Sequence, residues 1–126
     1  MTTDYVAVRP DWTVKKTLEH IRQFGKGSET LTVVYVVDKD WHLVDDFRIR
    51  EILLAPPDES IKNLMDRKFV SLTATDDQET AIAVFRKYDR VALPVTDTKG
   101  VLIGIVTVDD VLDVLQISRR LAVLMR

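Results

Sequence analysis

The chain has 126 residues, 46% of them hydrophobic, and its 18 basic and 20 acidic side chains leave a formal net charge of −2. It is long enough to bury one core, and its charge provides no global attraction to nucleic acid. The absence of cysteine excludes a disulfide framework, a thiolate metal site and a cysteine nucleophile, and fits a reducing compartment such as the cytosol. The longest apolar run, residues 31–37, is far shorter than the roughly 20 residues of a membrane-spanning helix.

The first half predicts a strand, a helix, two strands and a closing helix. Residues 5–8 form the opening strand, and Asp11 stands where a helix N-cap is expected. The following helix has one apolar face, formed by Val14, Leu18, Ile21 and Phe24. Glycines and polar residues predict a loop at 25–29, and strands are expected over 31–37 and 41–47.

A proline-rich linker joins the two halves. Residues 56–59 read Pro-Pro-Asp-Glu, which does not continue a helix. Ser60 is expected to cap a short helix that runs through residues 61–65.

The second half predicts the same order of elements. Residues 69–72 form its opening strand, and Thr75 with Gln78 reads as a capping box for the next helix. The apolar face of that helix contains Ala81, Ile82, Phe85 and Tyr88. Strands over 91–96 and 101–106 follow, and a closing helix begins near residue 108.

These parallels make the chain an internal duplication. An offset of 64 residues carries Tyr5 onto Phe69, and an offset of 59 carries Val36 onto Val95. The five-residue difference between the offsets falls in loop 25–29. The predicted fold class is therefore mixed α/β (α+β), with two tandem β-α-β-β-α repeats.

The repeats are expected to span residues 1–58 and 59–126, the second carrying a C-terminal helical extension. Each half is near the lower size limit for independent folding, so the two should share one core.

Thr107 and Asp110 form the most informative motif, at the junction between the last predicted strand and the closing helix. Two interpretations stand. Thr-x-x-acidic is a helix capping box, whereas the N–H groups and dipole of such a junction also suit a phosphate, and a nearby carboxylate can accept hydrogen bonds from ribose hydroxyls.

A family resemblance rests on these same stretches. Residues 92–97, Gly100 and 104–111 resemble the second half of a CBS-domain pair, a regulatory module that commonly binds adenosine nucleotides. Three stretches are most similar to the cytosolic CBS pair of MgtE-type magnesium transporters: 5–9, 77–79 and 106–115. Residues 1–5 match the interior stretch at which that pair begins, which implies an excised regulatory fragment whose Met1 need not be a natural start.

The resemblance implies a nucleotide site in the second repeat. Val70, Arg90, Val91 and Ala92 match positions that hold the adenine and its sugar by backbone contacts and apolar packing. Asp110 matches the ribose position and Thr107 the phosphate position. For Val70, Val91 and Ala92, core packing is the competing interpretation, because backbone contacts need no particular side chain.

The first repeat departs from this pattern. Three positions change between the repeats: Gly104, Thr107 and Asp110 become Asp45, Arg48 and Glu51. We therefore expect one nucleotide per chain. Arg48 is either an exposed, solubilising residue or a phosphate ligand reaching across the module. His20 and His42 are expected to be ordinary surface or packing residues, with no third metal ligand at suitable spacing.

Asp109, Asp110 and Asp113 gather on one side of the predicted closing helix. In the resembling transporters, acidic residues on this helix face an acidic N-terminal domain across bound Mg²⁺. Like charges at this spacing repel, and magnesium accepts carboxylate oxygens with retained waters. The alternatives are a weak Mg²⁺ site and a solvated acidic face. The family's acidic continuation is absent here, where residues 116–120 read Gln-Ile-Ser-Arg-Arg.

The resemblance implies a regulatory, non-enzymatic module that binds an adenine nucleotide, ATP or AMP, and contributes to Mg²⁺-dependent gating at the cytoplasmic face of a membrane. Its expected partners are a second copy of the chain, an acidic N-terminal domain and a transmembrane domain, and no nucleic acid. The alternative function is a general adenine-nucleotide energy sensor attached to another enzyme or transporter. An acid/base pair of Asp109 with Asp110 is disfavoured, because adjacent helical side chains point about 100° apart.

Overall fold

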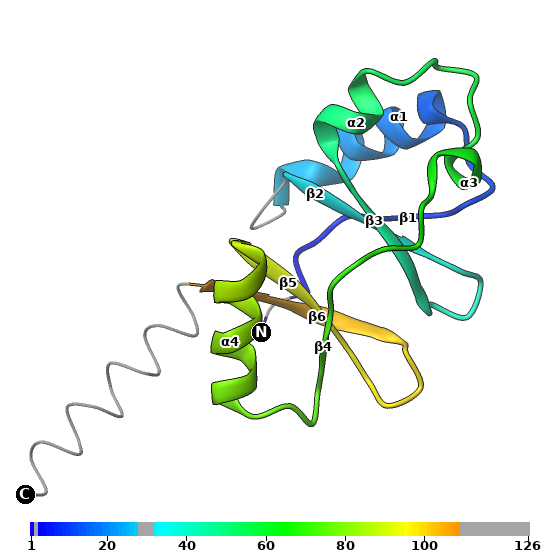
Figure 1. Cartoon of the computed structure of the whole chain (residues 1–126). Helices are drawn as coiled ribbons and strands as arrows, with labels where there is room; N and C mark the ends of the chain where they lie inside the picture. The colour runs from blue at the N-terminus through cyan, green and yellow to red at the C-terminus, as the bar shows by residue number, and fades with distance from the viewer. Residues whose placement is uncertain (2, 28–31, 109–126) are drawn as a thin grey trace, which may run out of the picture.

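The computed structural model describes residues 1, 3–27 and 32–108, which form two three-stranded sheets and their helices (Figure 1). The strands are β1 (Ala7–Val8), β2 (Val33–Val37), β3 (Leu43–Arg48), β4 (Leu72–Thr73), β5 (Ala92–Thr96) and β6 (Leu102–Thr107). The helices are α1 (Val14–Phe24), the 3-10 turn η1 (Gly25–Gly27), α2 (Ile49–Leu53), α3 (Ile61–Leu64) and α4 (Gln78–Tyr88). The predicted second closing helix and C-terminal extension lie outside the described residues.

Both sheets have the same topology, which confirms the predicted mixed α/β class and the duplication. In each, the opening strand pairs in parallel with the middle strand, which pairs antiparallel with the last. The register also repeats, since Val36 opposes Asp45 and Val95 opposes Gly104. Even the irregularity in the ladder recurs at the equivalent place, directly after Val36 and Val95.

The two repeats meet through equivalent residues. Leu43 N–H donates to Gly100 C=O at 3.0 Å, and Leu102 N–H donates to Trp41 C=O at 2.9 Å. At an offset of 59 these two hydrogen bonds exchange with each other, so they describe a pseudo-twofold axis. A core cluster drawn from β2, β3 and β6 surrounds this junction: Tyr35, Val37, Leu43, Leu102 and Ile105. The repeats therefore share core residues, as predicted.

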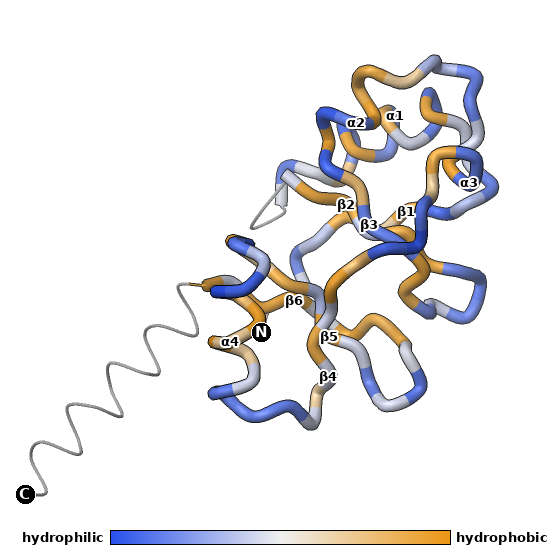
Figure 2. Tube along the Cα trace, viewed as in Figure 1, coloured by the Kyte–Doolittle hydropathy of each residue, from blue (hydrophilic) through white to orange (hydrophobic). Residues whose placement is uncertain are grey.

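Two further clusters fill the individual repeats. The first joins β1, β2 and β3 to α1, α2 and α3, and the second joins β4 and β5 to α4. Figure 2 shows the apolar residues concentrated along the strands, while the β2–β3 and β5–β6 turns are largely polar. No helix among the described residues combines the length and apolarity that crossing a membrane requires.

The helix caps differ from the predicted ones. Thr13 caps α1, where its Oγ1 accepts from Lys16 N–H at 3.1 Å, and Asp77 caps α4, where its Oδ1 accepts from Thr80 N–H at 2.8 Å. Asp11 and Thr75 each precede these positions by two residues, too far back to receive the N–H of the first turn. Gln78 is the first residue of α4, so it cannot complete the capping box predicted behind Thr75.

The predicted apolar helix faces are wrong at their last members. Phe24 and Tyr88 are exposed, because each helix ends there, beyond the sheet that buries its earlier turns. Ser60 occupies the predicted N-cap of α3, yet its hydroxyl donates to Pro10 C=O at 3.3 Å. The strand predictions are right in position, although each strand begins one to three residues later than expected.

Candidate functional site

The predicted nucleotide-site residues that the structure describes gather at one end of the β5–β6 ladder. Ala92 opposes Thr107 across the two strands, and Val108 N–H donates to Val91 C=O at 2.9 Å. Thr107 is buried and Val91 is 59% exposed. Val70 is half-buried and packs against the second repeat's own cluster. Asp109, Asp110 and Asp113 lie outside the described residues.

A cavity of about 410 Å³ lies between the repeats beside this end of the ladder. Arg90 and Val91 line it from the second repeat, and Arg48 with Arg50 lines it from the first. The remaining lining residues are Thr32, Val33, Ile49 and Asp89. The structure thus brings Arg48 to the same cavity as two of the predicted site residues.

A second, more polar cavity of about 230 Å³ shares Arg48 and Arg90 with the first. Its other charged lining residues are Asp46, Glu51, Asp66 and Lys68. Arg90 thus lies between an apolar cavity and a cluster of carboxylates, and no local sequence pattern indicated this cluster.

Asp46 has the most perturbed titration among these residues. Burial is the largest cause, and it raises the pKa of the Asp46 carboxyl to about 6. The Arg90 guanidinium opposes that rise, whereas Asp45, Glu51 and Asp66 add to it. Burial, followed by the charge of Asp46, also raises the pKa of the Tyr35 hydroxyl, and Arg90 again acts in the opposite direction. Arg90 is therefore the main positive charge facing this half-buried carboxyl group.

Asp45, which replaces Gly104 of the other repeat, has a structural role. Its side chain is 1% exposed. Oδ1 accepts from Asp46 N–H at 2.9 Å, and Oδ2 accepts from the N–H groups of Asp66 and Arg67, both at 3.1 Å. The carboxylate therefore fastens the segment after α3 to β3, where Arg67 takes a positive φ of 59°. The alternation along the strand could have predicted this burial, because Asp45 lies between Leu43 and Phe47 on the inward side of β3.

The expectation that His42 has no companion ligands is wrong. Asp38, Asp40 and His42 in the β2–β3 turn offer ligand atoms that all lie within 4.8 Å of one another. Asp38 Oδ1 accepts from the N–H groups of Asp40 and His42, both at 2.9 Å, and the His42 hydrogen bond is the main reason that the pKa of Asp38 is lowered. These hydrogen bonds stabilise the β2–β3 turn and explain why the three side chains lie close together. His20 packs between Trp12 and Phe24, as a packing residue does.

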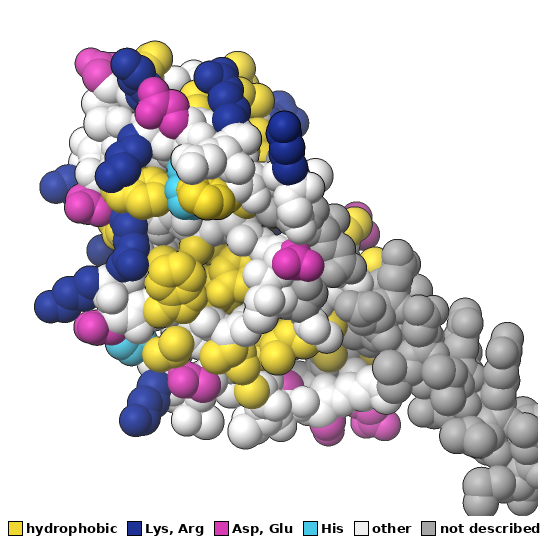
Figure 3. Space-filling model, turned by 180° about the vertical axis from the view of Figure 1, so that it is seen from behind, with side chains coloured by type: hydrophobic (Ala, Val, Ile, Leu, Met, Phe, Trp, Pro, Cys, Tyr) yellow, Lys and Arg dark blue, Asp and Glu magenta, His cyan; other side chains and the backbone are white. Residues whose placement is uncertain are grey.

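Chemically, the larger inter-repeat cavity suits an anion attached to a flat apolar group. Guanidinium groups donate paired hydrogen bonds to phosphate oxygens, and Arg48, Arg50 and Arg90 all line this cavity. Val33, Ile49 and Val91 provide its apolar surface. On the face of the molecule opposite that of Figure 1, apolar side chains gather and charged ones surround them (Figure 3).

The CBS domain family profile matches the chain twice, over residues 1–58 and 61–117. The magnesium transporter MgtE of Thermus thermophilus is 40% identical over 116 residues, which are 92% of this chain and 26% of that protein. MgtE of Bacillus subtilis is 35% identical over 114 residues, or 90% of the chain and 25% of that protein. The chain thus spans about a quarter of the length of these relatives.

Two solved structures are also similar. The soluble part of a magnesium transporter has a TM-score of 0.88 and 36% identity, covering 94% of this chain and 46% of that one. The cytosolic domain of the Mg²⁺ channel MgtE in complex with ATP has a TM-score of 0.85 and 40% identity, covering 90% of this chain and 46% of that one.

Proposed function

The chain belongs to the CBS domain family, and on that premise we propose that it is a regulatory module of a magnesium transporter that binds an adenine nucleotide between its repeats. The MgtE relatives support the transporter assignment at 35–40% identity. The solved relative in complex with ATP supports the ligand class. The observation that carries the proposal is the cavity that Arg48 and Arg90 line from opposite repeats.

In this proposal, the nucleotide lies at the end of β5 and β6. Val70, Arg90, Val91 and Ala92 hold the adenine and sugar, Asp110 accepts from the ribose, and Thr107 faces the phosphates. Arg48 adds a phosphate contact from the first repeat, since it lines the same cavity as Arg90 and Val91. Because Arg48 and Glu51 replace Thr107 and Asp110 at the equivalent positions, one nucleotide binds per chain.

The module is regulatory and carries out no catalysis. It acts at the cytoplasmic face of the membrane, as a homodimer, beside an acidic N-terminal domain and a transmembrane domain of the longer protein. Asp109, Asp110 and Asp113 form a weak Mg²⁺ site that the acidic domain completes. Mg²⁺ and the nucleotide together set the state of the transport pathway.

Calorimetric titration with ATP and AMP tests the nucleotide assignment. We expect saturable binding of one nucleotide per chain, which Asp110→Ala weakens by about 1.5–3 kcal/mol, as the loss of a charged hydrogen bond does. Asp58→Ala in the exposed linker is the matched control and should bind as the parent does. No heat, and no rise in melting temperature with millimolar nucleotide, would overturn the proposal.

Thermal unfolding without nucleotide tests the metal assignment. Mg²⁺ should raise the melting temperature more than sodium chloride at equal ionic strength, and Asp113→Asn should remove the difference. Equal effects of the two salts on the parent would indicate simple screening of a solvated acidic face.

A further inference from the structure

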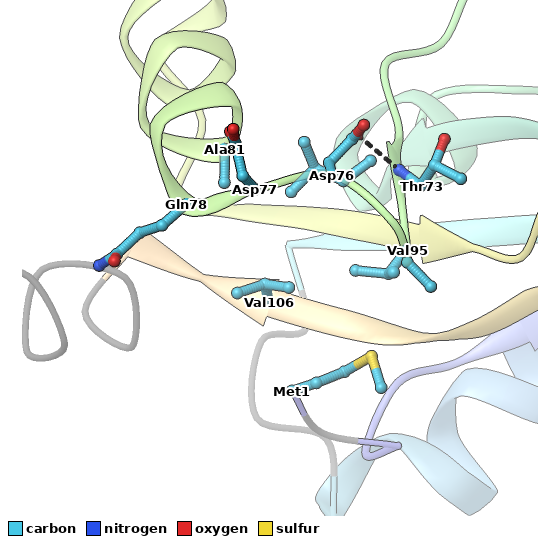
Figure 4. Close-up of a pocket in the computed structure, with 10 residues that line it drawn as sticks. Met1, Thr73, Asp76, Asp77, Gln78, Ala81, Val95 and Val106 are labelled. Atoms are coloured by element: carbon cyan, nitrogen blue, oxygen red, sulfur yellow. Dashed lines mark hydrogen bonds between the residues drawn. The ribbon is translucent and has the colours of Figure 1, made fainter.

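A third hollow, of about 380 Å³, lies in the second repeat between the first turn of α4 and strands β5 and β6 (Figure 4). Its apolar lining comes from Leu72, Ala74, Ala81, Val95 and Val106, with Met1 at its edge. Its polar lining comes from Thr73, Asp76, Asp77 and Gln78, at and before the α4 N-terminus. This hollow shares no lining residue with the proposed nucleotide cavity.

In the first repeat, the equivalent place is filled by α3. Ile61 is fully buried there and belongs to the first repeat's core cluster. The backbone around it is tied to the start of α1, because Ile61 N–H donates to Trp12 C=O and Val14 N–H donates to Glu59 C=O, at 2.9 and 2.8 Å. At the offset of 64, Trp12 and Val14 correspond to Asp76 and Gln78, which line the hollow.

Side chains at equivalent positions of the two repeats are more deeply buried in the first repeat than in the second. Val8 and Val36 belong to the same core cluster as Ile61 of α3. These two residues and Thr17 of α1 are all 0% exposed. Their counterparts in the hollow are Leu72 at 4%, Val95 at 5% and the half-buried Ala81. The second repeat thus retains an apolar floor without the turn that covers it in the first.

Met1 indicates the direction from which a covering segment arrives. At the offset of 64 it corresponds to Met65, which directly follows α3 and packs against the first cluster. Met1 itself lines the hollow. A chain that enters Met1 from its N-terminal side therefore passes the place that α3 occupies in the other repeat.

We propose that this hollow holds a short helical turn of the α3 type, formed in the longer protein by the roughly eight residues that precede Met1. One apolar side chain of that turn takes the place of Ile61. The chain's own tail is a poorer occupant, because the offset of 59 places Arg120 at the Ile61 position, and an unpaired guanidinium is costly to bury on an apolar floor. The relatives, about four times as long as this chain, have the length to supply the turn.

The segment's own sequence provides the test. Residues 57–64, Pro-Asp-Glu-Ser-Ile-Lys-Asn-Leu, are added directly before Met1, which reproduces their spacing to Met65. We expect the melting temperature to rise by roughly 3–6 °C, and amide exchange to slow at residues 76–81 and at Val95 and Val106.

The matched control is the same extension with its isoleucine replaced by aspartate, which should give neither effect. In the extended protein, Ala81→Glu should cancel the gain by placing a charge in the hollow. Equal melting temperatures for the isoleucine and aspartate extensions would overturn the proposal. A second outcome would also overturn it: the isoleucine extension gives no gain in melting temperature, and Leu121→Asp in the original chain speeds amide exchange at residues 76–81. That outcome would identify the chain's own tail as the occupant. Nucleotide titration of the same proteins reports separately on the proposed function.

Discussion

Asp45 and Asp46 are consecutive residues of β3, point to opposite faces of its sheet, and have different roles. Asp45 is a buried carboxylate whose two oxygens accept three backbone N–H groups. Asp46 faces the acidic cluster and Arg90 at the cavity between the repeats. Successive side chains of a strand point to opposite faces of the sheet, and this is why two adjacent aspartates have different surroundings.

Removal of the Asp45 carboxylate should destabilise the fold. Asp45→Ala leaves the N–H groups of Asp66 and Arg67 without their acceptor, so we expect a loss of about 2–4 kcal/mol in the free energy of unfolding. Asp45→Asn keeps one acceptor oxygen and should lose less. Urea denaturation measures both, and an Asp45→Ala protein as stable as the parent would contradict the structural role.

Asp46 should make stability depend on pH. Its folded pKa of about 6 lies above the unfolded value, so the native state binds more protons between these values and stability falls as pH rises through that window. The rise of the Asp46 pKa to about 6, discounted for the partial exposure of its side chain, corresponds to about 1 kcal/mol.

Asp46→Asn should therefore stabilise the protein by about 1 kcal/mol at pH 7.5 and by almost nothing at pH 4. Urea denaturation at the two pH values measures this, with Asp58→Asn as an exposed control. A gain that is equal at both pH values would show that the Asp46 charge is not the cause.

At the scale of single elements, the helix caps are the feature that neither local pattern nor the repeat offset could predict. The sequence contains Asp, Thr or Ser at several places before each helix, and motif matching alone favours Asp11 and Thr75. Thr13 and Asp77, the real caps, are related by the offset of 64, but so are Asp11 and Thr75, so the offset does not choose between the two pairs. The positions of the helices and strands and their order along the chain could be predicted from periodicity and duplication, because each is a local or repeated pattern.

Alanine at the real caps should cost about 1 kcal/mol each, because one N–H in the first turn loses its acceptor. Thr13→Ala and Asp77→Ala are therefore expected to lower the free energy of unfolding by that amount. Asp11→Ala and Thr75→Ala, two residues earlier, should stay within about 0.5 kcal/mol of the parent. The reverse order in urea denaturation would restore the cap positions predicted from the motif.

The parts of the site that the sequence did not predict depend on contacts between the repeats. The sequence allowed two interpretations of Arg48, as an exposed solubilising residue or as a phosphate ligand. In the structure, Arg48 and Arg90 line the same cavity. Asp46 acquires its environment from Arg90 and Asp66, which are 44 and 20 residues away in the chain. No local pattern encodes such approaches, because they follow from the pseudo-twofold packing of the sheets.

At the scale of the whole molecule, the shared core should make the two repeats unfold together. Ile105 is fully buried at the junction, in a cluster with residues of both repeats. Ile105→Ala should cost about 2–5 kcal/mol and shift a single transition that is the same by tryptophan fluorescence, which reports on the first repeat, and by far-ultraviolet circular dichroism. Two separate transitions would contradict a shared core.

The most direct test of a nucleotide bound between the repeats compares ATP with adenosine in the Arg48→Ala protein. Arg48 lines the cavity from the first repeat, whereas the residues proposed to hold the adenine come from the second. Loss of the Arg48 side chain should therefore remove a phosphate contact and leave the adenine contacts intact. Calorimetry should show one ATP bound per chain in the parent. In Arg48→Ala the affinity for ATP should be at least tenfold weaker, while the affinity for adenosine is unchanged. The control Arg22→Ala, on the exposed side of α1, should bind both ligands as the parent does. Unchanged ATP affinity in Arg48→Ala, or two equivalent ATP sites in the parent, would contradict the account.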